Sequence, residues 1–270
     1  MPSGGPAKAM PRLAGGSRGV NRSETWPDCA ATALPLACHA MAEDPVAAAD
    51  TQGHRARLRS RLLDSSGEAL LDHELVEYLL MLAMPRIDTK PIAKALLREF
   101  GGIGGVLAAD PVALTRVEKM GDAGAAAMKV AQALGLRLLQ AEVAARPVLA
   151  NWQALLDYLR ADMAHHAVER FRVLHLNTRN MLIRDELMSE GTIDQTAVYV
   201  RDVIRRALEL GSAALILVHN HPSGDPSPSR ADIEVTRAIA EVGRALNISV
   251  HDHIIMGTSG HASLRAKGLI

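Results

Sequence analysis

The stretch AALILVHNHPSGDPSPSRAD, residues 213–232, decides the fold of the C-terminal half. Its apolar start predicts a buried strand over Ala214–Val218, because a short apolar run bounded by turn residues is typical of a strand inside a sheet. A loop rich in proline and glycine follows, and such residues favour turns. The chain then enters a helix at Ser229, so this stretch predicts a strand, a tight loop and a helix in succession.

Two histidines stand where the predicted strand ends. On an extended backbone, side chains two residues apart project to the same face, so His219 and His221 can direct two imidazoles at one point. Asp232 would lie on the first helical turn, where the loop can bring its carboxylate back to them. Two imidazoles and one carboxylate leave a fourth tetrahedral position for water, which is what a catalytic zinc site requires.

Each part of this pattern also has a local interpretation. A His-x-His pair by itself is often two surface or capping histidines, and Ser229 with Asp232 has the form of a helix capping box. A capping role and a ligand role for Asp232 do not exclude each other. Asp225 is a rival carboxylate, but its place in the middle of the loop indicates a turn former.

Hydrophobic periodicity divides the rest of the chain into two folded regions. Between residues 54 and 145, apolar residues recur at helical spacing without β-branched alternation, which predicts an all-helical domain. After Pro147 strands and helices mix, which predicts an α/β or α+β domain. We expect helices at 70–84, 92–100, 111–117, 123–140, 152–160, 200–210 and 229–246, and strands at 171–176, 181–183, 187–189, 214–218, 248–251 and 254–256. The expected divisions are a tail at 1–50, a helical domain at 51–146 and a metal domain at 147–270.

Composition narrows the function classes. Residues 1–50 mix Gly, Pro, Ala and Ser without periodicity, so we expect a disordered tail, with Met41 as an alternative start. Cys29 and Cys38 both lie in this tail, which argues against a disulfide framework or a thiolate zinc site and favours the cytoplasm. No window is apolar enough to predict a membrane span. Thirty basic residues balance thirty acidic ones, which is not typical of a strongly electrostatic nucleic-acid binder.

His-x-His, seven residues, Ser, two residues and Asp is the signature of the JAMM (MPN+) metalloproteases, and residues 219–232 fit it without a gap. More specifically, the chain resembles the RadC family of bacterial proteins across residues 54–270. The segments that carry the resemblance are HRARLRSRLL, LLDHELVEYLLMLA, RIDTKPIAKALLREFGGIGGVL, VYVRDVIRRALELGSAALILV, HNHPSGDPSPSRADIEVT and DHIIMG.

The resemblance implies roles for individual residues. His219, His221 and Asp232 would bind one Zn²⁺ per chain, and Ser229 would hold the oxyanion or orient the water. The general base would be Glu169, which precedes FRVLHL. By position alone, Glu186 and Glu190 are nearly equal rivals.

The later His251-Asp252-His253 run is a second histidine pair. We expect Asp252 and His253 to have a structural role or to orient a metal ligand, rather than to bind the metal. His251 lies outside the family pattern. We expect His165 and His166, in a polar stretch before the first strand, to face solvent.

The helical domain resembles a helix-hairpin-helix, in which a Gly-x-Gly turn offers backbone amides to a DNA phosphate. At the matching place Gly121 is present, but Ala123 replaces the second glycine and Asp122 adds a negative charge. Nucleic-acid binding is therefore expected to be weak. An arginine cluster could still touch a DNA backbone, although such runs are usually solvated faces: Arg55, Arg57, Arg59 and Arg61.

These observations predict a zinc-dependent metallopeptidase that acts on a peptide or protein substrate, in a family whose name is tied to DNA repair. Two alternatives stay open. One is a DNA-repair accessory or DNA-binding protein with a structural metal. The other is a metal-dependent hydrolase of a non-peptide bond, which a single zinc makes less favourable because two-metal clamps are common in phosphodiester hydrolysis.

Overall fold

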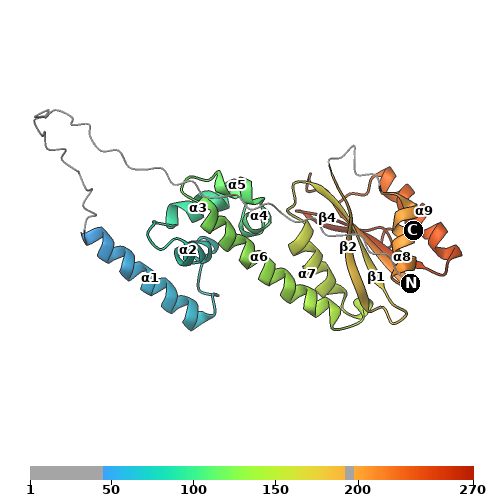
Figure 1. Ribbon diagram of the computed structural model, residues 1–270, viewed down its shortest axis with the longest axis horizontal. Coiled ribbons are helices and arrows are strands. Elements are labelled where there is room, and N and C mark those ends of the chain that lie inside the picture. Colours follow the sequence, from blue (N-terminus) through green and yellow to red (C-terminus); the bar gives the residue numbers. More distant parts are fainter. Residues whose placement is uncertain (1–44, 192–197) are drawn as a thin grey trace, which may run out of the picture. The chain divides into compact units, whose positions relative to one another are not determined.

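The computed structural model describes residues 45–191 and 198–270 (Figure 1), with side chains from residue 53 onward. The tail expected at 1–50 lies outside the described residues as far as residue 44. Helix α1, Pro45–Ser65, covers its end. Among the helices that the structure describes, none is long and apolar enough to cross a membrane.

The helical region follows the expected pattern. Helices α2 (Asp72–Ala83), α3 (Lys90–Phe100), α5 (Pro111–Thr115) and α6 (Gly121–Ala144) enclose a core built from Leu, Ile, Val and Met. Helix α4, Ile103–Ala108, was not expected, because its sequence is rich in glycine. A Cβ atom at position 105 would lie 1.9 Å from the carbonyl oxygen of Phe100. Glycine is therefore needed for this close approach, and the buried Val106 holds the short helix in place.

The C-terminal region is a five-stranded mixed sheet with helices on both faces (Figure 1). The region begins with a short 3₁₀ turn (Val148–Ala150) and helix α7 (Trp152–Met163), followed by strands β1 (Glu169–Leu176) and β2 (Leu182–Gly191). The elements that come next along the chain are α8 (Val200–Glu209), β3 (Ala214–Asn220), α9 (Arg230–Ala245), β4 (Ser249–Gly257) and β5 (Gly260–Ser263). The strand order is β2-β1-β3-β4-β5, with β3 and β4 parallel and the other pairs antiparallel. The predicted α/β fold class is confirmed.

Two cores lie on the two faces of this sheet. Helix α7 packs on one face, against Leu174, Ile216 and Val218. Helices α8 and α9 cover the other face, against Val173 and Leu217. Alternating residues of β1 and β3 pack into one core and then the other. Both strands are therefore buried on both sides, and their sequences are nearly continuous apolar runs.

The strand boundaries differ from the expected ones at the sheet margins. The two pieces expected at 181–183 and 187–189 form one edge strand, β2, whose polar middle is held by ion pairs such as Arg172 with Asp185 at 2.9 Å. The pieces at 248–251 and 254–256 likewise form one strand, β4, because the polar residues between them are buried and bonded. Strand β5 was not expected. It is four residues long, too short for a periodic signal.

Candidate metal centre

Strand β3 positions the two histidines. Its last ladder pair joins His219 to Phe171 of β1, and the His221 N–H donates to the Met256 carbonyl at 2.8 Å, which keeps the chain extended beyond the strand. Since side chains alternate, both imidazoles face the side of the sheet that α9 covers. His219 is 1% exposed and His221 is half-buried. The predicted shared direction of the two rings is what the structure has.

The first turn of α9 brings Asp232 to the same point. Ser229 is the N-cap: its Oγ accepts from the Asp232 N–H at 3.2 Å, and its own N–H donates to Asp232 Oδ2 at 2.7 Å. The carboxylate lies 3.2 Å from His219 Nε2 and 3.6 Å from His221 Nε2. One ligand atom from each of the three side chains lies within 4.8 Å of the others. The capping box and the metal-type cluster thus coexist, as the sequence allowed.

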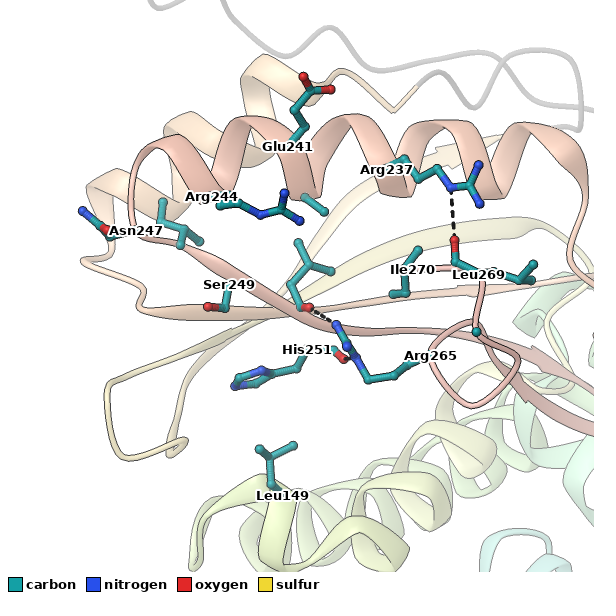
Figure 2. A pocket seen from close by; sticks show the side chains of 14 residues that line it. Leu149, Arg237, Glu241, Arg244, Asn247, Ser249, His251, Arg265, Leu269 and Ile270 are labelled. Atoms are coloured by element: carbon teal, nitrogen blue, oxygen red, sulfur yellow. Dashed lines mark hydrogen bonds between the residues drawn. The ribbon is translucent and has the colours of Figure 1, made fainter.

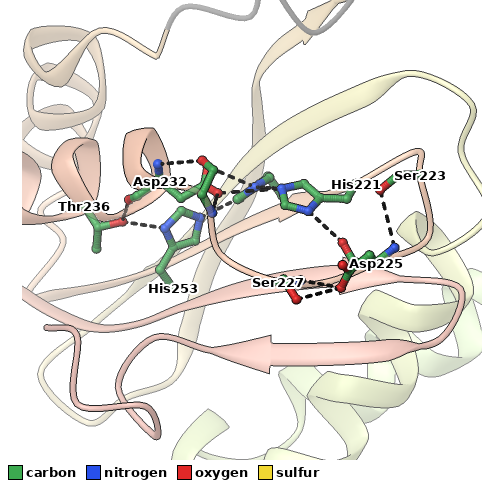
Figure 3. A network of polar contacts seen from close by, with 9 residues as sticks. His221, Ser223, Asp225, Ser227, Asp232, Thr236 and His253 are labelled. Atoms are coloured by element: carbon green, nitrogen blue, oxygen red, sulfur yellow. Dashed lines mark hydrogen bonds and ion pairs between the residues drawn. The ribbon is translucent and has the colours of Figure 1, made fainter.

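A chain of hydrogen bonds fixes which nitrogen of His219 carries the proton (Figure 3). The Thr236 hydroxyl donates to the Asp232 carbonyl, which can only accept. Its oxygen must therefore accept from His253 Nδ1, at 2.5 Å, which leaves His253 Nε2 bare. That nitrogen accepts from His219 Nδ1 at 2.8 Å. His219 Nε2 is consequently a lone pair aimed at the cluster.

The same argument holds for His221. Its Nδ1 lies 2.8 Å from the backbone carbonyl of Asp225, so Nδ1 carries the proton and Nε2 is bare. The two bare nitrogens are 2.9 Å apart beside a carboxylate. With both rings neutral, the two nitrogens and the carboxylate converge as acceptors, which is unfavourable unless a cation or a proton lies between them. The donor set therefore fits a divalent metal such as zinc, which takes imidazole and carboxylate ligands.

The electrostatics of the cluster agree with this arrangement. Burial lowers the pKa of His219 to about 4 and that of His253 well below its usual value, so both rings stay neutral. Burial by itself would raise the pKa of Asp232, but the bond with His221, the nearby His219 and the bonds from Ser229 outweigh it and lower that pKa. The hydrogen bond to Asp232 raises the pKa of His221. Where no metal is bound, a proton on His221 is thus the natural competitor for the site.

Glu169 lies in the same pocket. The pocket has a volume of about 530 Å³ and is lined by Glu169 and Ser229 together with the three cluster residues. Glu169 precedes Phe171 by two residues on β1, so it projects to the face that carries His219. Burial raises the pKa of Glu169, against the opposing effect of His221.

The rival glutamates are engaged elsewhere. Glu186 accepts from Arg206 at 2.9 Å, and Glu190 pairs with Arg170 at 3.0 Å. Neither lines the pocket that contains the cluster.

The expectation for Asp252 needs correction. Its carboxylate accepts from Ser263 and from the backbone N–H groups of His253 and Arg265, so it fastens the C-terminal turn and contacts none of the three cluster residues. Neighbouring residues on a strand face opposite ways, which is why Asp252 and His253 have different surroundings.

The three other histidines considered in the sequence analysis lie outside the cluster. His251 bonds Asn180 at 2.8 Å. His165 is exposed as expected, but His166 is half-buried beside Arg170, and burial lowers its pKa to about 4.

A larger pocket of about 1090 Å³ lies at the far end of α9, which we call the C-terminal pocket (Figure 2). It is lined by α9, the start of β4 and the last residues of the described chain. Arg265 donates to the carbonyls of His251 and Val250, and Arg237 donates to the Leu269 carbonyl at 3.1 Å. These arginine side chains satisfy backbone carbonyl groups. No member of the metal-type cluster lines this pocket.

In the helical region, Arg61 and Arg55 of the arginine cluster make contacts within the fold. Arg61 makes two bonds to Glu74, at 2.7 and 2.9 Å, and Arg55 reaches the Ile87 carbonyl at 3.4 Å. Gly121 has a left-handed φ of 59°, as a hairpin glycine requires, and Asp122 is exposed in the first turn of α6.

The family description "RadC-like JAB domain" matches residues 149–269. A UPF0758 protein of Rhodobacter capsulatus is 50% identical over 213 residues, which is 79% of this chain and 100% of that relative. The chain belongs to the RadC family.

The match of this RadC protein to the JAB domain takes in Glu169 and the three cluster residues. The predicted RadC resemblance is thereby confirmed, and a metal-dependent hydrolase fold is consistent with the family.

Sequence reasoning missed two buried polar residues beside the centre. Thr236 closes the chain of hydrogen bonds around His219, and its spacing of four from Asp232 on one helix was the available signal. Asn220, between the two histidines, is 1% exposed and points to the opposite face. Nothing in the local sequence indicates its partners, which lie about fifty residues away.

Proposed function

We propose that this chain is a zinc-dependent hydrolase that cleaves a peptide or isopeptide bond in a peptide or protein substrate. One observation carries the proposal: two bare imidazole nitrogens converge with the Asp232 carboxylate in a pocket that also contains Glu169. Structural zinc sites are closed by four protein ligands, whereas three ligands with an open position suit catalysis. A carboxylate beside three such ligands supports the catalytic alternative.

The zinc would be held by Nε2 of His219, Nε2 of His221 and the carboxylate of Asp232. When bound, zinc acidifies water and polarises a carbonyl group. Among the described residues, one group of side chains could hold a metal. This favours a peptide-type bond over a phosphodiester, for which paired metals are common.

Glu169 is the proposed general base. Its carboxylate would take a proton from the attacking water and later deliver it to the leaving amine. The burial that raises the pKa of Glu169 brings this group closer to the pH at which it must both accept and release a proton.

Ser229 is proposed to stabilise the developing oxyanion. Its Oγ accepts from the Asp232 N–H, and its hydroxyl group is directed at the Asp232 carboxylate, whose pKa that bond helps to lower. Ser229 lines the same pocket as Glu169, so this hydroxyl group could turn from Asp232 to an oxygen that gains negative charge in the pocket.

The test is Glu169→Gln in zinc-loaded protein, assayed with quenched-fluorophore peptides and lysine isopeptides. A general base need not bind the metal, so zinc content and thermal stability should stay near those of the parent. Hydrolysis should fall on the order of a hundredfold or more, because the amide cannot accept the proton. Glu186→Gln, a half-buried glutamate of the same sheet, is the matched control and should keep full activity. A parent that holds zinc yet cleaves no member of the panel would overturn the proposal.

A further inference from the structure

The side chain of Asn220, on strand β3, hydrogen-bonds the peptide groups on both sides of Glu169. The Arg170 N–H donates to Asn220 Oδ1 at 2.9 Å, and Asn220 Nδ2 donates to the Val168 carbonyl at 3.1 Å. The Val168 carbonyl belongs to the peptide bond before Glu169, and the Arg170 N–H belongs to the one after it. A weaker contact from Nδ2 reaches the His166 carbonyl at 3.3 Å.

The position of Asn220 explains why a side chain is needed there. The backbone ladder between β1 and β3 ends at Phe171 and His219, so it stops short of Glu169. On its other side Glu169 is paired with Gly191, the last residue of β2. The Asn220 carboxamide thus takes the place of a strand partner on the β3 side. Its amide matches the donor and acceptor pattern of a backbone.

The consecutive residues His219, Asn220 and His221 therefore have roles on both faces of the sheet. His219 and His221 point to the metal-type cluster, while Asn220 points away and fixes the backbone that carries the proposed base. The carboxamide is buried and all three of its contacts go to main-chain atoms. Unpairing it would leave buried backbone groups without partners, which is costly.

We propose that Asn220 is a positioning residue that sets where the Glu169 carboxylate stands relative to the two histidines. This inference rests on the proposed function. It predicts that Asn220 acts on catalysis through Glu169, without contributing to metal binding. A displacement of about 1 Å in a reacting group can cost on the order of a hundredfold in rate.

The test uses Asn220→Ala and Asn220→Asp as full-length, zinc-loaded proteins, with the same peptide and isopeptide reporters. The aspartate keeps an acceptor for the Arg170 N–H, but its carboxylate cannot donate to the two carbonyl oxygens. It therefore removes these hydrogen bonds without creating a cavity. We expect full zinc content, kcat reduced on the order of tenfold or more and KM within about twofold of the parent. The Arg170 amide, which Asn220 Oδ1 protects, should exchange with deuterium faster in Asn220→Ala.

A second readout separates this role from general destabilisation. Among the described residues, the charged groups that act on Glu169 are His221, which directly follows β3, and Asp232 of α9. When the hydrogen bonds from Asn220 are lost, Glu169 gains access to water and its pKa falls. The acid limb of the kcat/KM profile should therefore move to lower pH. Asn177→Ala is the matched control, because Asn177 also ties main-chain N–H groups, at the opposite end of β1. It should lower stability without moving the acid limb.

The outcomes distinguish the two proposals. If the parent cleaves a reporter but both Asn220 variants keep its kcat and acid limb, the inference fails and the proposed function stands. Loss of zinc in either Asn220 variant also contradicts it, since the residue would then support the metal ligands. If the zinc-loaded parent cleaves no reporter, the proposed function fails and the catalytic meaning of Asn220 fails with it.

Discussion

The two pockets at either end of α9 differ in how their polar atoms are paired. The C-terminal pocket is about twice as large, yet its arginines donate to backbone carbonyls and its histidine bonds an asparagine. In the smaller pocket, Nε2 of His219, Nε2 of His221 and the Asp232 carboxylate converge on one point, and neutral rings supply no proton between the two nitrogens. Convergent acceptors that are not satisfied, rather than volume, mark the place where a cation and chemistry belong.

The largest effect should come from removing one ligand. His221→Ala leaves two protein ligands, below the three that a catalytic zinc site uses, so the chain should lose its zinc. His221 is half-buried, so the loss of packing is small. His251→Ala makes the matched change in the C-terminal pocket and should retain about one zinc per chain, measured by elemental analysis. Equal zinc content in the two variants would remove the distinction between the pockets.

A smaller effect should follow from Thr236→Val, which keeps the shape but cannot accept from His253 or donate to the Asp232 carbonyl. The tautomer of His219 is then no longer enforced. Zinc affinity, measured by competition with a chelating dye, should fall about 10–100-fold, the usual range for a residue that supports a ligand. Thr236→Ser restores the hydroxyl and should recover most of the affinity. An unchanged affinity in Thr236→Val would mean that the hydrogen-bond chain does not tune the site.

His175 sharpens the comparison, because it is a buried imidazole outside both pockets. Its Nδ1 bonds Ser212 at 2.9 Å and its Nε2 has no hydrogen-bond partner. Burial lowers its pKa to about 4. The unfolded chain therefore binds a proton here below about pH 6.5 while the folded chain does not, so stability is lost as the pH falls from about 6.5 towards 4.

The variant His175→Asn keeps a partner for Ser212 but cannot titrate in this range. Between pH 7 and pH 5 the parent should lose about 2 kcal/mol more of its unfolding free energy than the variant does. Urea denaturation of the zinc-free proteins at the two pH values measures this difference. If the parent and the variant lose the same unfolding free energy between the two pH values, His175 is not the cause of the pH dependence.

The smallest effect is expected in the helical region. By the resemblance to a helix-hairpin-helix, Asp122 and Ala123 stand where a phosphate would be held, and Arg61 hydrogen-bonds Glu74. Duplex DNA should therefore bind weakly and without sequence preference, as measured by fluorescence anisotropy at physiological salt. A submicromolar affinity would reverse this expectation, and Asp122→Gly would then be expected to tighten binding further.

Local patterns predicted the elements whose signals are local. The apolar run at Ala214–Val218 and the alternation of His219 and His221 were sufficient for β3 and for the direction of both rings. The edge strand β2 was split in the prediction because its polar middle is stabilised by Arg172 and Arg206, which lie elsewhere in the sequence. The contacts of Asn220 could not be predicted, since its partners lie on another strand.

The alternation along β3 has a consequence for engineering. A deletion of one residue within Ala214–Val218 would turn both imidazoles towards the opposite core and bring the Asn220 carboxamide to the metal side. Side-chain substitutions in this strand alter one contact, whereas a change of length exchanges the roles of the two faces. Libraries that seek altered specificity should therefore vary residue identity around the pocket and leave the length of this strand unchanged.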